Sequence, residues 1–262
     1  MKDCREEWFD AERKVAVTIV DVTSAAQALV RGHLCGPTSA YYLTKALAAA
    51  ALLGAETSEA DETVIVQMKC DGPLGGFNVE CTAAGTLRGY TERKTLDDFD
   101  GLGRLDDRKV IGACQVQVTR SVPGRILSQG IAASLDGYLA GSLQRRACLR
   151  TEALVTDEAE VTAARGLMVE DMPDAAPPLV CCHIAELKSL TVASRNMLRQ
   201  LGLERAELRR TTPLSFACRC SPDRAVAMLA ALPEEERRTL PPTVDVTCHM
   251  CGRTFSVKGS LK

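Results

Sequence analysis

The stretch that organises this chain reads FACRCS at residues 216–221 and TCHMCG at residues 247–252. It contains two close pairs of cysteines, Cys218 with Cys220 and Cys248 with Cys251, separated by the 27 residues 221–247. Two short thiol-bearing loops, joined by enough chain to fold back, are typical of a tetrahedral Cys₄ zinc site. We therefore predict that these four cysteines bind Zn²⁺.

The residues around the two pairs predict the local structure of this module. Gly252 directly follows the last cysteine and can take the positive φ of a tight turn, and the strand formers after it indicate a hairpin. Ser221 can cap a helix that has Pro222 at its first position and stops before Pro233. Such a helix would bring the two thiol pairs back together.

Other interpretations of the four cysteines remain open. They could form two structural disulfides, remain as buried free thiols, or act as a thioredoxin-like redox pair, and His249 could replace one cysteine as a ligand. The N-terminal residues carry both signs of charge and lead into no apolar signal region, which counts against stable disulfides. The Cys248 pair does not lie near a βαβ pattern, which counts against a thioredoxin-like site.

The chemistry of the predicted site makes it sensitive to oxidation. Four thiolates around one dication carry excess negative charge, so their sulfurs are electron-rich. Oxidation to disulfides removes the thiolates that hold the metal. In so small a module the free energy of zinc binding is also folding free energy, so metal loss should unfold it. The site can therefore work as a switch as well as a structural staple.

The rest of the chain indicates an α+β protein with a mainly aliphatic core, because aromatic residues make up only 4% of it. β-branched and apolar runs predict strands at residues 14–22, 62–70, 77–82, 110–119, 126–131, 147–155 and 166–169. Helical spacing and capping residues predict helices at 25–31, 39–54 and 135–145, and a charged exposed loop at 91–108.

The composition changes at residues 174–178, where the sequence reads DAAPP. We predict three parts: an N-terminal α/β domain at 1–176, a helical amphipathic linker at 177–212, and the zinc module at 213–262. Apolar linker residues lie at helical spacings among arginines, which indicates two helices packed on the first domain. Short helices depend on packing, and Gly202 weakens the second, so loss of the zinc module should loosen them and expose apolar surface.

Charge and composition limit the classes of function. The net charge is −2, and residues 211–262 carry seven Lys/Arg against five Asp/Glu, a balance of 7 − 5 = +2. This is weak for a zinc-ribbon nucleic-acid-binding protein, which is the alternative function. No apolar run approaches the ~20 residues of a membrane span, and cysteines without an export signal favour the cytoplasm. The sequence contains no recognised enzyme motif, so we expect no catalysis. A thiol oxidoreductase remains the third alternative function.

The chain has 12 cysteines, eight of them outside the two pairs. Cys181 and Cys182 are adjacent, where a bridge would be strained, and they follow an apolar helical pattern, so we predict buried free thiols. The other six show no pairing pattern in the sequence and receive no predicted role: Cys4, Cys35, Cys70, Cys81, Cys114 and Cys148.

The cysteine pairs and several other motifs resemble the heat shock protein 33 family of bacterial redox-regulated zinc chaperones. The resemblance also includes LPEEE at residues 232–236, QMKCDGP at 67–73, RGY at 88–90 and GLMVEDMP at 166–173, in the expected order along most of the chain. It implies a holdase that binds unfolded or misfolded client proteins without ATP under oxidative stress.

The same resemblance implies a mechanism. Oxidation would join Cys218 to Cys220 and Cys248 to Cys251, release zinc, and unfold the linker so that client-binding surface is exposed. It also implies a homodimer in the oxidised state. The extra cysteines of this chain make further pairings possible in that state.

Overall fold

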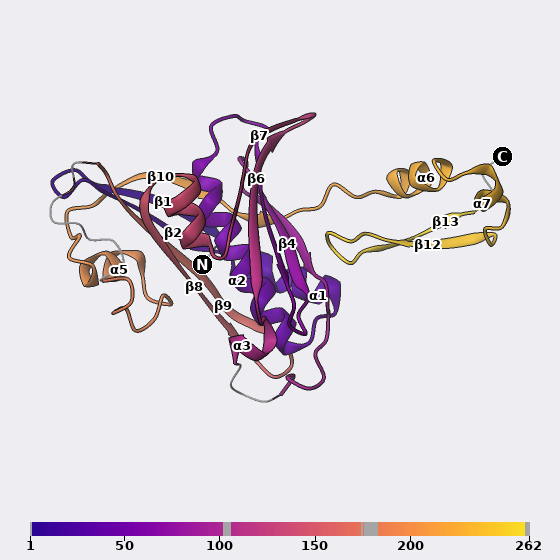
Figure 1. Cartoon of the computed structure of the whole chain (residues 1–262), viewed down its shortest axis with the longest axis horizontal. Coiled ribbons are helices and arrows are strands. Elements are labelled where there is room, and N and C mark those ends of the chain that lie inside the picture. The colour runs from indigo at the N-terminus through magenta and orange to yellow at the C-terminus, as the bar shows by residue number, and fades with distance from the viewer. Residues whose placement is uncertain (1, 102–105, 174, 176–182, 260–262) are drawn as a thin grey trace.

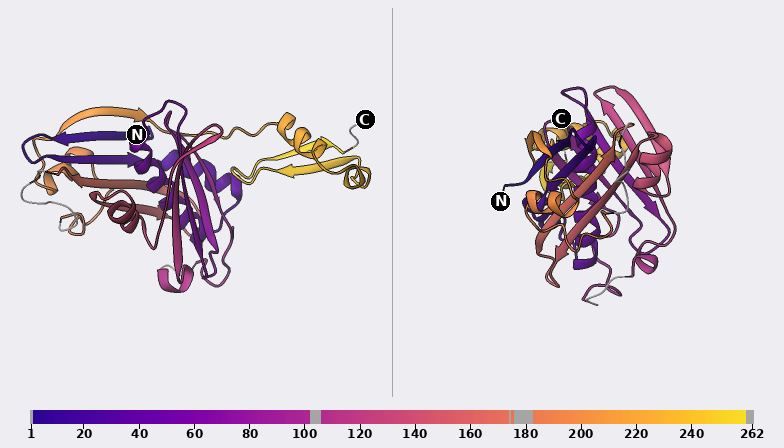
Figure 2. Two further views of the ribbon diagram at one scale, coloured as in Figure 1. Left: turned by 45° about the horizontal axis from the view of Figure 1, so that its top comes forward. Right: turned by 90° about the vertical axis from the view of Figure 1, so that its left-hand side faces the viewer.

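The computed structural model describes residues 2–101, 106–173, 175 and 183–259. Two β-sheets with helices between them form the body of the molecule, and a hairpin module with its own helices extends from one end (Figure 1). Figure 1 and the left-hand view of Figure 2 place the linker helix α5 at the end of this body opposite the module. The protein therefore mixes helices and strands, as the α+β prediction requires.

The first sheet has five strands in the order β10-β1-β2-β9-β8, and every neighbouring pair is antiparallel. The bounds of its strands are β1 Cys4–Asp10, β2 Val15–Asp21, β8 Arg146–Val155, β9 Val161–Asp171 and β10 Glu207–Pro213. β2 is buried along nearly its whole length because it lies at the centre of the sheet, between β1 and β9. Its run of β-branched residues suits that position.

The second sheet has six strands in the order β11-β5-β4-β3-β6-β7. Its strands are β3 Thr63–Cys70, β4 Gly76–Thr82, β5 Thr86–Thr91, β6 Cys114–Val122, β7 Arg125–Ala132 and the short β11 Ser215–Phe216. Only β11 pairs in parallel, with β5, while the other pairs are antiparallel. β11 belongs to the C-terminal part of the chain, so the second sheet ties that part to the N-terminal body.

Helices α1 (Thr23–His33) and α2 (Pro37–Leu53) follow β2 and are succeeded by the 3₁₀ turn η1 (Gly54–Glu56). α2 contacts strands of both sheets, which explains why almost every one of its residues is buried and why it is so rich in alanine. Leu43, Leu47 and Ala50, which share the predicted core-facing spacing, are at most 1% exposed. The helix predicted at residues 39–54 is confirmed, and it begins two residues earlier, at Pro37.

The linker residues build a second apolar core on the five-stranded sheet. Helix α5 (Ser194–Gln200) supplies Met197, which is 0% exposed, and the turn before it supplies Leu190, also 0% exposed. They pack with Trp8 and other strand residues in one cluster. The linker therefore covers apolar strand residues that would otherwise face solvent.

The C-terminal module contains α6 (Pro222–Ala230), α7 (Glu234–Arg238) and an antiparallel hairpin of β12 (Thr243–Thr247) and β13 (Thr254–Lys258). Its own apolar cluster is small, and its buried members are Ala225, Leu229 and Val257. A core of this size stabilises a fold only weakly.

Three predicted elements around residues 91–145 are wrong in part. The strand predicted from residue 110 begins at Cys114, because residues 107–110 form the short helix α3 (Asp107–Val110), capped by the Asp106 side chain. The loop predicted to be exposed at 91–108 contains the buried Leu96. The helix predicted at 135–145 is reduced to α4 (Leu135–Gly137) and the π-turn η2 (Tyr138–Ser142). Gly137 and Gly141 lower its helix propensity, and Gln144 with φ 52° ends it.

The linker is also less helical than predicted. Residues 207–213 form β10, which pairs with the edge strand β1, so Leu208 lies on a strand and is 44% exposed. The second predicted helix forms only as α5, and hydrogen bonding to the free edge of β1 replaces its C-terminal part. The proposed domain boundary at 176/177, and the predicted free thiols Cys181 and Cys182, lie outside the described residues. Across the described ranges, no helix combines the length and apolar character that crossing a membrane requires.

Candidate metal centre

The first cysteine pair is positioned by the edge of the second sheet. Ser215 and Phe216 pair in parallel with Thr86 and Leu87, and the Ala217 N–H donates to the Leu87 carbonyl oxygen at 3.1 Å. This pairing carries the chain alongside β5 and places Cys218 next to Arg88. The pair is therefore held by the N-terminal body as well as by its own module.

The helix after this pair begins as predicted. The Ser221 side chain accepts a hydrogen bond from the Arg224 N–H at 3.2 Å, and Pro222 occupies the first turn of α6. Both features satisfy or avoid the free N–H groups at a helix start. α6 then runs to Ala230, so the predicted helix is confirmed.

The second cysteine pair lies in the turn between β12 and β13, which we call the knuckle (residues 248–252). The Gly252 N–H donates to the Cys248 carbonyl oxygen at 2.9 Å, and the Cys248 N–H donates to the Arg253 carbonyl oxygen at 2.9 Å. Gly252 has φ 71°, which glycine adopts without strain, as the sequence predicted. The predicted hairpin is confirmed.

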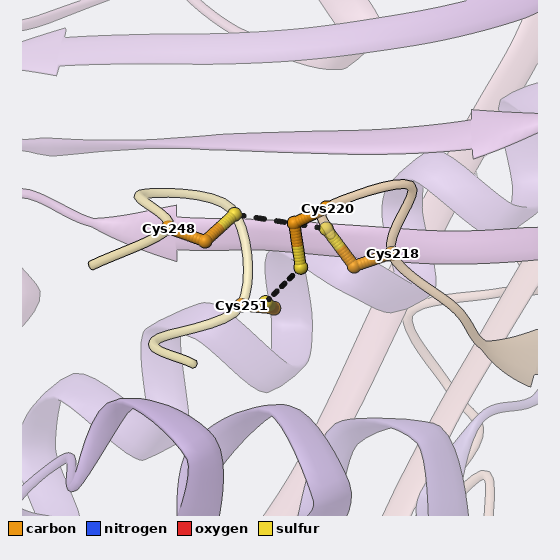
Figure 3. Close-up of side chains that lie close together, drawn as sticks. All are labelled: Cys218, Cys220, Cys248 and Cys251. Carbon is orange, nitrogen blue, oxygen red and sulfur yellow. Dashed lines mark hydrogen bonds between the residues drawn. The ribbon is translucent and has the colours of Figure 1, made fainter. Parts of the chain in front are cut away.

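The structure brings the four predicted cysteines together (Figure 3). Their sulfur atoms all lie within 4.8 Å of one another, with 3.7 Å between Cys218 and Cys248 and 3.4 Å between Cys220 and Cys251. Sulfurs at the corners of a tetrahedron with Zn–S bonds of about 2.3 Å would stand about 3.8 Å apart. These separations fit a metal site and are far longer than an S–S bond.

His249, the alternative ligand, points elsewhere. Its ring makes an edge-on contact with Tyr90, with 5.4 Å between ring centroids. Among the described residues, the group that could hold a metal ion consists of the four cysteines and does not include His249.

The local environment shifts the pKa values of thiols in the cluster in different directions. Burial opposes ionisation of Cys218, but hydrogen bonds from the Cys220 backbone N–H, the Cys220 thiol and Arg88 outweigh it and lower its pKa to about 7. Burial raises the pKa of Cys220, and the hydrogen bond with Cys218 adds to this effect, while the hydrogen bond with Cys251 opposes it. Burial and the hydrogen bonds of nearby thiols raise the pKa of Cys251. Of these three thiols, Cys218 therefore ionises most readily, and a coordinated cation would help to keep Cys220 and Cys251 deprotonated.

The knuckle packs against the N-terminal body through backbone atoms. The Gly89 N–H donates to the Met250 carbonyl oxygen at 3.1 Å, and the Gly89 carbonyl oxygen accepts from His33 Nε2 at 2.8 Å. Arg88 pairs with Glu80 at 2.6 Å and places another guanidinium nitrogen 3.9 Å from the Cys218 sulfur. The metal centre therefore lies at the junction of module and body.

These docking residues are not predictable from the local sequence. RGY at 88–90 was noted only as a family motif, and His33 lies in α1, far from the cysteines along the chain. Burial lowers the pKa of His33, the opposing hydrogen bond to Gly89 being the smaller effect. No local pattern marks such residues, because their contacts depend on how the two parts dock.

Comparison with known proteins agrees with this geometry. The family model described as Hsp33 protein matches residues 7–258. The chain belongs to the Hsp33 family. Its relatives include the 33 kDa chaperonin of Thermus thermophilus, 29% identical over 274 residues that cover 93% of this chain and 80% of that protein. The 33 kDa chaperonin of Lacticaseibacillus paracasei is 26% identical over 259 residues, 90% of this chain and 88% of that protein.

Among solved structures, the 33 kDa chaperonin of Thermotoga maritima has the same fold. The TM-score is 0.86 at 19% identity, over 99% of this chain and 96% of that chain. Membership of the Hsp33 family supports a chaperone function for this chain, and binding of client proteins follows from that function.

Proposed function

We propose that this Hsp33 family member is a redox-regulated holdase, a chaperone that binds unfolding proteins without turnover and prevents their aggregation. The observation that carries the proposal is the Cys₄ cluster at the junction between the C-terminal module and the body. A chemical change at its sulfurs acts directly on the contact between the two parts.

The donor set fits zinc. Four sulfur ligands, Cys218, Cys220, Cys248 and Cys251, form a closed set typical of a structural zinc site, and soft thiolates favour Zn²⁺ over hard cations. A bound zinc ion would supply the positive charge that keeps all four sulfurs as thiolates. Because the apolar cluster has only three buried residues in the described part of the module, this metal would contribute much of the module's folding free energy.

Oxidation at the cluster would remove the ligands. In each pair, two thiolates give two electrons to hydrogen peroxide, a disulfide forms, and with two protons the peroxide becomes two waters. The pairing that we propose, on family resemblance, is Cys218 with Cys220 and Cys248 with Cys251. The disulfide sulfurs no longer carry the charge that binds a dication, so zinc is lost and the module unfolds.

Unfolding of the module would loosen the linker. β10 ends at Pro213, and only β11 separates it from Cys218. The Leu214 N–H donates to the Asp3 carbonyl oxygen at 3.0 Å, so this short segment is held at the edge of the sheet. Once the cluster opens, the segment after β10 loses one of the contacts that hold it, and β10 can separate from β1.

The surface that would then bind clients is the outer face of the five-stranded sheet together with the apolar linker residues. Trp8, Ile19 and Leu167 lie on that face and are buried beneath the linker. Arg195 of α5 stacks over Trp8 at 4.5 Å and covers it further. An apolar surface uncovered only after oxidation suits capture of unfolding proteins.

The domain bounds, oligomeric state and location that we propose rest on the sequence and on the family resemblance. The domains are 1–176, 177–212 and 213–262, the oxidised chaperone is a homodimer, and it acts in the cytoplasm on unfolded or misfolded proteins. Catalysis, nucleic acid and membrane are not part of this function.

The test compares Cys251→Ser with Cys4→Ser. Cys251 lies in the cluster, whereas Cys4 is a half-buried strand cysteine outside it. We expect Cys251→Ser to lose zinc and to suppress client aggregation before any oxidant is added. Cys4→Ser should hold one zinc and need peroxide. Zinc content and light scattering of an aggregating client decide it, and a Cys251→Ser protein that keeps zinc and needs peroxide would contradict the proposal.

A further inference from the structure

A second pair of cysteines lies in the six-stranded sheet, distant from the metal centre in the sequence. Cys70 is the last residue of β3, Cys114 is the first residue of β6, and the two are direct partners across the antiparallel ladder. Both are half-buried free thiols. Neither belongs to the Cys₄ cluster.

The hydrogen bonds on both sides show which kind of pair this is. The next residue, Asp71, donates its N–H to the Ala113 carbonyl oxygen at 3.1 Å, so 71 and 113 form the hydrogen-bonded pair. The Cys70 N–H instead donates to Gly75, on the side of β4, at 3.2 Å. Cys70 and Cys114 are therefore a non-hydrogen-bonded pair, in which the Cα atoms lie about 4.5 Å apart and the side chains approach most closely.

This geometry matches the requirements of a disulfide. Bridged cysteines have Cα atoms about 4.4–6.8 Å apart and Cβ atoms about 3.5–4.5 Å apart. We propose that Cys70 and Cys114 form a cross-strand disulfide under oxidising conditions, a second redox site that is independent of the metal centre.

The surrounding loops are already locked in a compatible arrangement. The Gly72 N–H donates to the Ile111 carbonyl oxygen at 2.9 Å, and the Leu74 N–H donates to Val110 at 3.2 Å. The Asp71 side chain accepts from the Ala113 N–H at 2.7 Å. A Cβ at position 72 would lie 2.5 Å from the Val110 oxygen, so the loops interlock at a glycine. The Cys114 thiol itself donates to the Ala133 carbonyl oxygen at 3.7 Å, so formation of the bond would break this hydrogen bond while the interlocked loops keep the two strands in register.

The reaction balances with hydrogen peroxide as the oxidant. Peroxide oxidises one thiol to a sulfenic acid and releases water, and the second thiol displaces the hydroxyl as a second water. Two thiol hydrogens and two electrons leave, and one S–S bond forms. Burial raises the pKa of Cys70, and the nearby Cys114 adds to this effect, so the reaction should speed up at alkaline pH.

The disulfide would be a covalent cross-link between β3 and β6 in the body of the protein. The bond would close the 43 residues 71–113, which include β4, β5 and the α3 segment, against the central strand β3. Closing a long loop restricts the unfolded chain and so stabilises the fold. Oxidation would then strengthen the six-stranded sheet by a bond of its own, whatever happens at the C-terminal cluster.

The test is peptide mapping of the folded, full-length protein after peroxide, with free thiols alkylated before digestion. Trypsin cuts after Lys69 and Lys109, and a glutamyl protease cuts after Glu80, which separates Cys70 from Cys81. We expect a linked peptide that joins residues 70–80 to 110–120. It should be absent from Cys70→Ser and Cys114→Ser and present in Cys4→Ser.

Zinc release is measured on the same samples, so that the fate of the metal centre is read separately from this pair. In Cys70→Ser, Cys114 should remain open to alkylation after peroxide. Recovery of both wild-type thiols in alkylated form, or linkage of Cys114 to any cysteine other than Cys70, overturns the inference. The wild-type map alone decides this, even where a variant does not fold.

Discussion

Gly32 and Gly252 meet backbone to backbone where the knuckle rests on the end of helix α1. A Cβ at position 252 would lie 2.0 Å from the Gly32 carbonyl oxygen, and a Cβ at position 32 would lie 2.6 Å from the Cys251 carbonyl oxygen. Both separations are shorter than side-chain atoms adopt. The module can dock in this position only because neither residue has a side chain.

Gly32→Ala should undock the knuckle without altering any cysteine. Alanine favours the α1 helix itself, but its methyl group meets the rigid backbone of Cys251, and overpacking of this kind costs about 1–3 kcal/mol. We expect zinc to stay bound in the reduced protein, its release by peroxide to be faster, and some holdase activity before oxidation. Gly141→Ala is the control, since a Cβ there meets nothing within 4 Å. Equal release rates in the two variants would refute the docking role.

Arg88→Gln should weaken zinc binding. The Arg88 guanidinium lies 3.9 Å from the Cys218 sulfur and also pairs with Glu80, so its loss removes a positive charge beside the thiolates and frees a negative one. We expect the affinity for zinc, measured by competition with a chelator, to fall by about 10-fold. Arg88→Lys, which keeps the charge, should lose less. Wild-type affinity in Arg88→Gln would show that this contact does not tune the cluster.

Met197→Ala should loosen the linker. Met197 is 0% exposed in the cluster between linker and sheet, and truncation of a buried methionine costs about 2–5 kcal/mol. We expect faster hydrogen exchange in residues 194–213 and stronger suppression of client aggregation by the reduced protein. Met228, which is 65% exposed, provides the control Met228→Ala. Faster exchange without any gain in activity would separate linker opening from client binding.

Glu62→Gln should make the body less sensitive to acid while lowering its stability at neutral pH. Glu62 is 0% exposed and pairs with Arg120 at 2.5 Å. Burial raises its pKa, but the bonds from Arg120, Ser58 and Glu59 prevail and lower it below 4.5. The carboxylate therefore contributes stability above pH 4.5 that is lost as the pH falls through the folded pKa.

The measurement is the urea midpoint of each protein between pH 7 and pH 3. We expect Glu62→Gln to lose about 1–3 kcal/mol at pH 7 and to approach the wild type at pH 3. Glu59→Gln, at an exposed ion pair with Arg125, should change little at either pH. A constant difference between wild type and Glu62→Gln across this range would mean that the charge of Glu62 is not the cause.

Local patterns were sufficient for much of the C-terminal module. Ser221 and Pro222 start α6 because the capping bond and the fixed φ of proline act within one helical turn. Gly252 turns the knuckle because a positive φ is a property of the residue itself. The spacing of the four cysteines predicted that they would meet, and the structure places their sulfurs within 4.8 Å.

Such local patterns do not predict contacts between segments that are distant in the sequence. Residues 207–213 became a strand because the free edge of β1 was available, although Leu208 lay at a helical spacing. Cys70 and Cys114 show no pairing pattern along the chain, and only the β3–β6 register brings them face to face.

The sequence by itself determined the two close cysteine pairs, the caps and the turns of this protein, because each depends on the chemistry of a few neighbouring residues. Only the tertiary structure decided where the cluster docks, what the linker covers and which remaining thiols meet. Those outcomes depend on sheet register and on backbone approaches such as that of Gly32 to Gly252, and these are properties of the assembled chain.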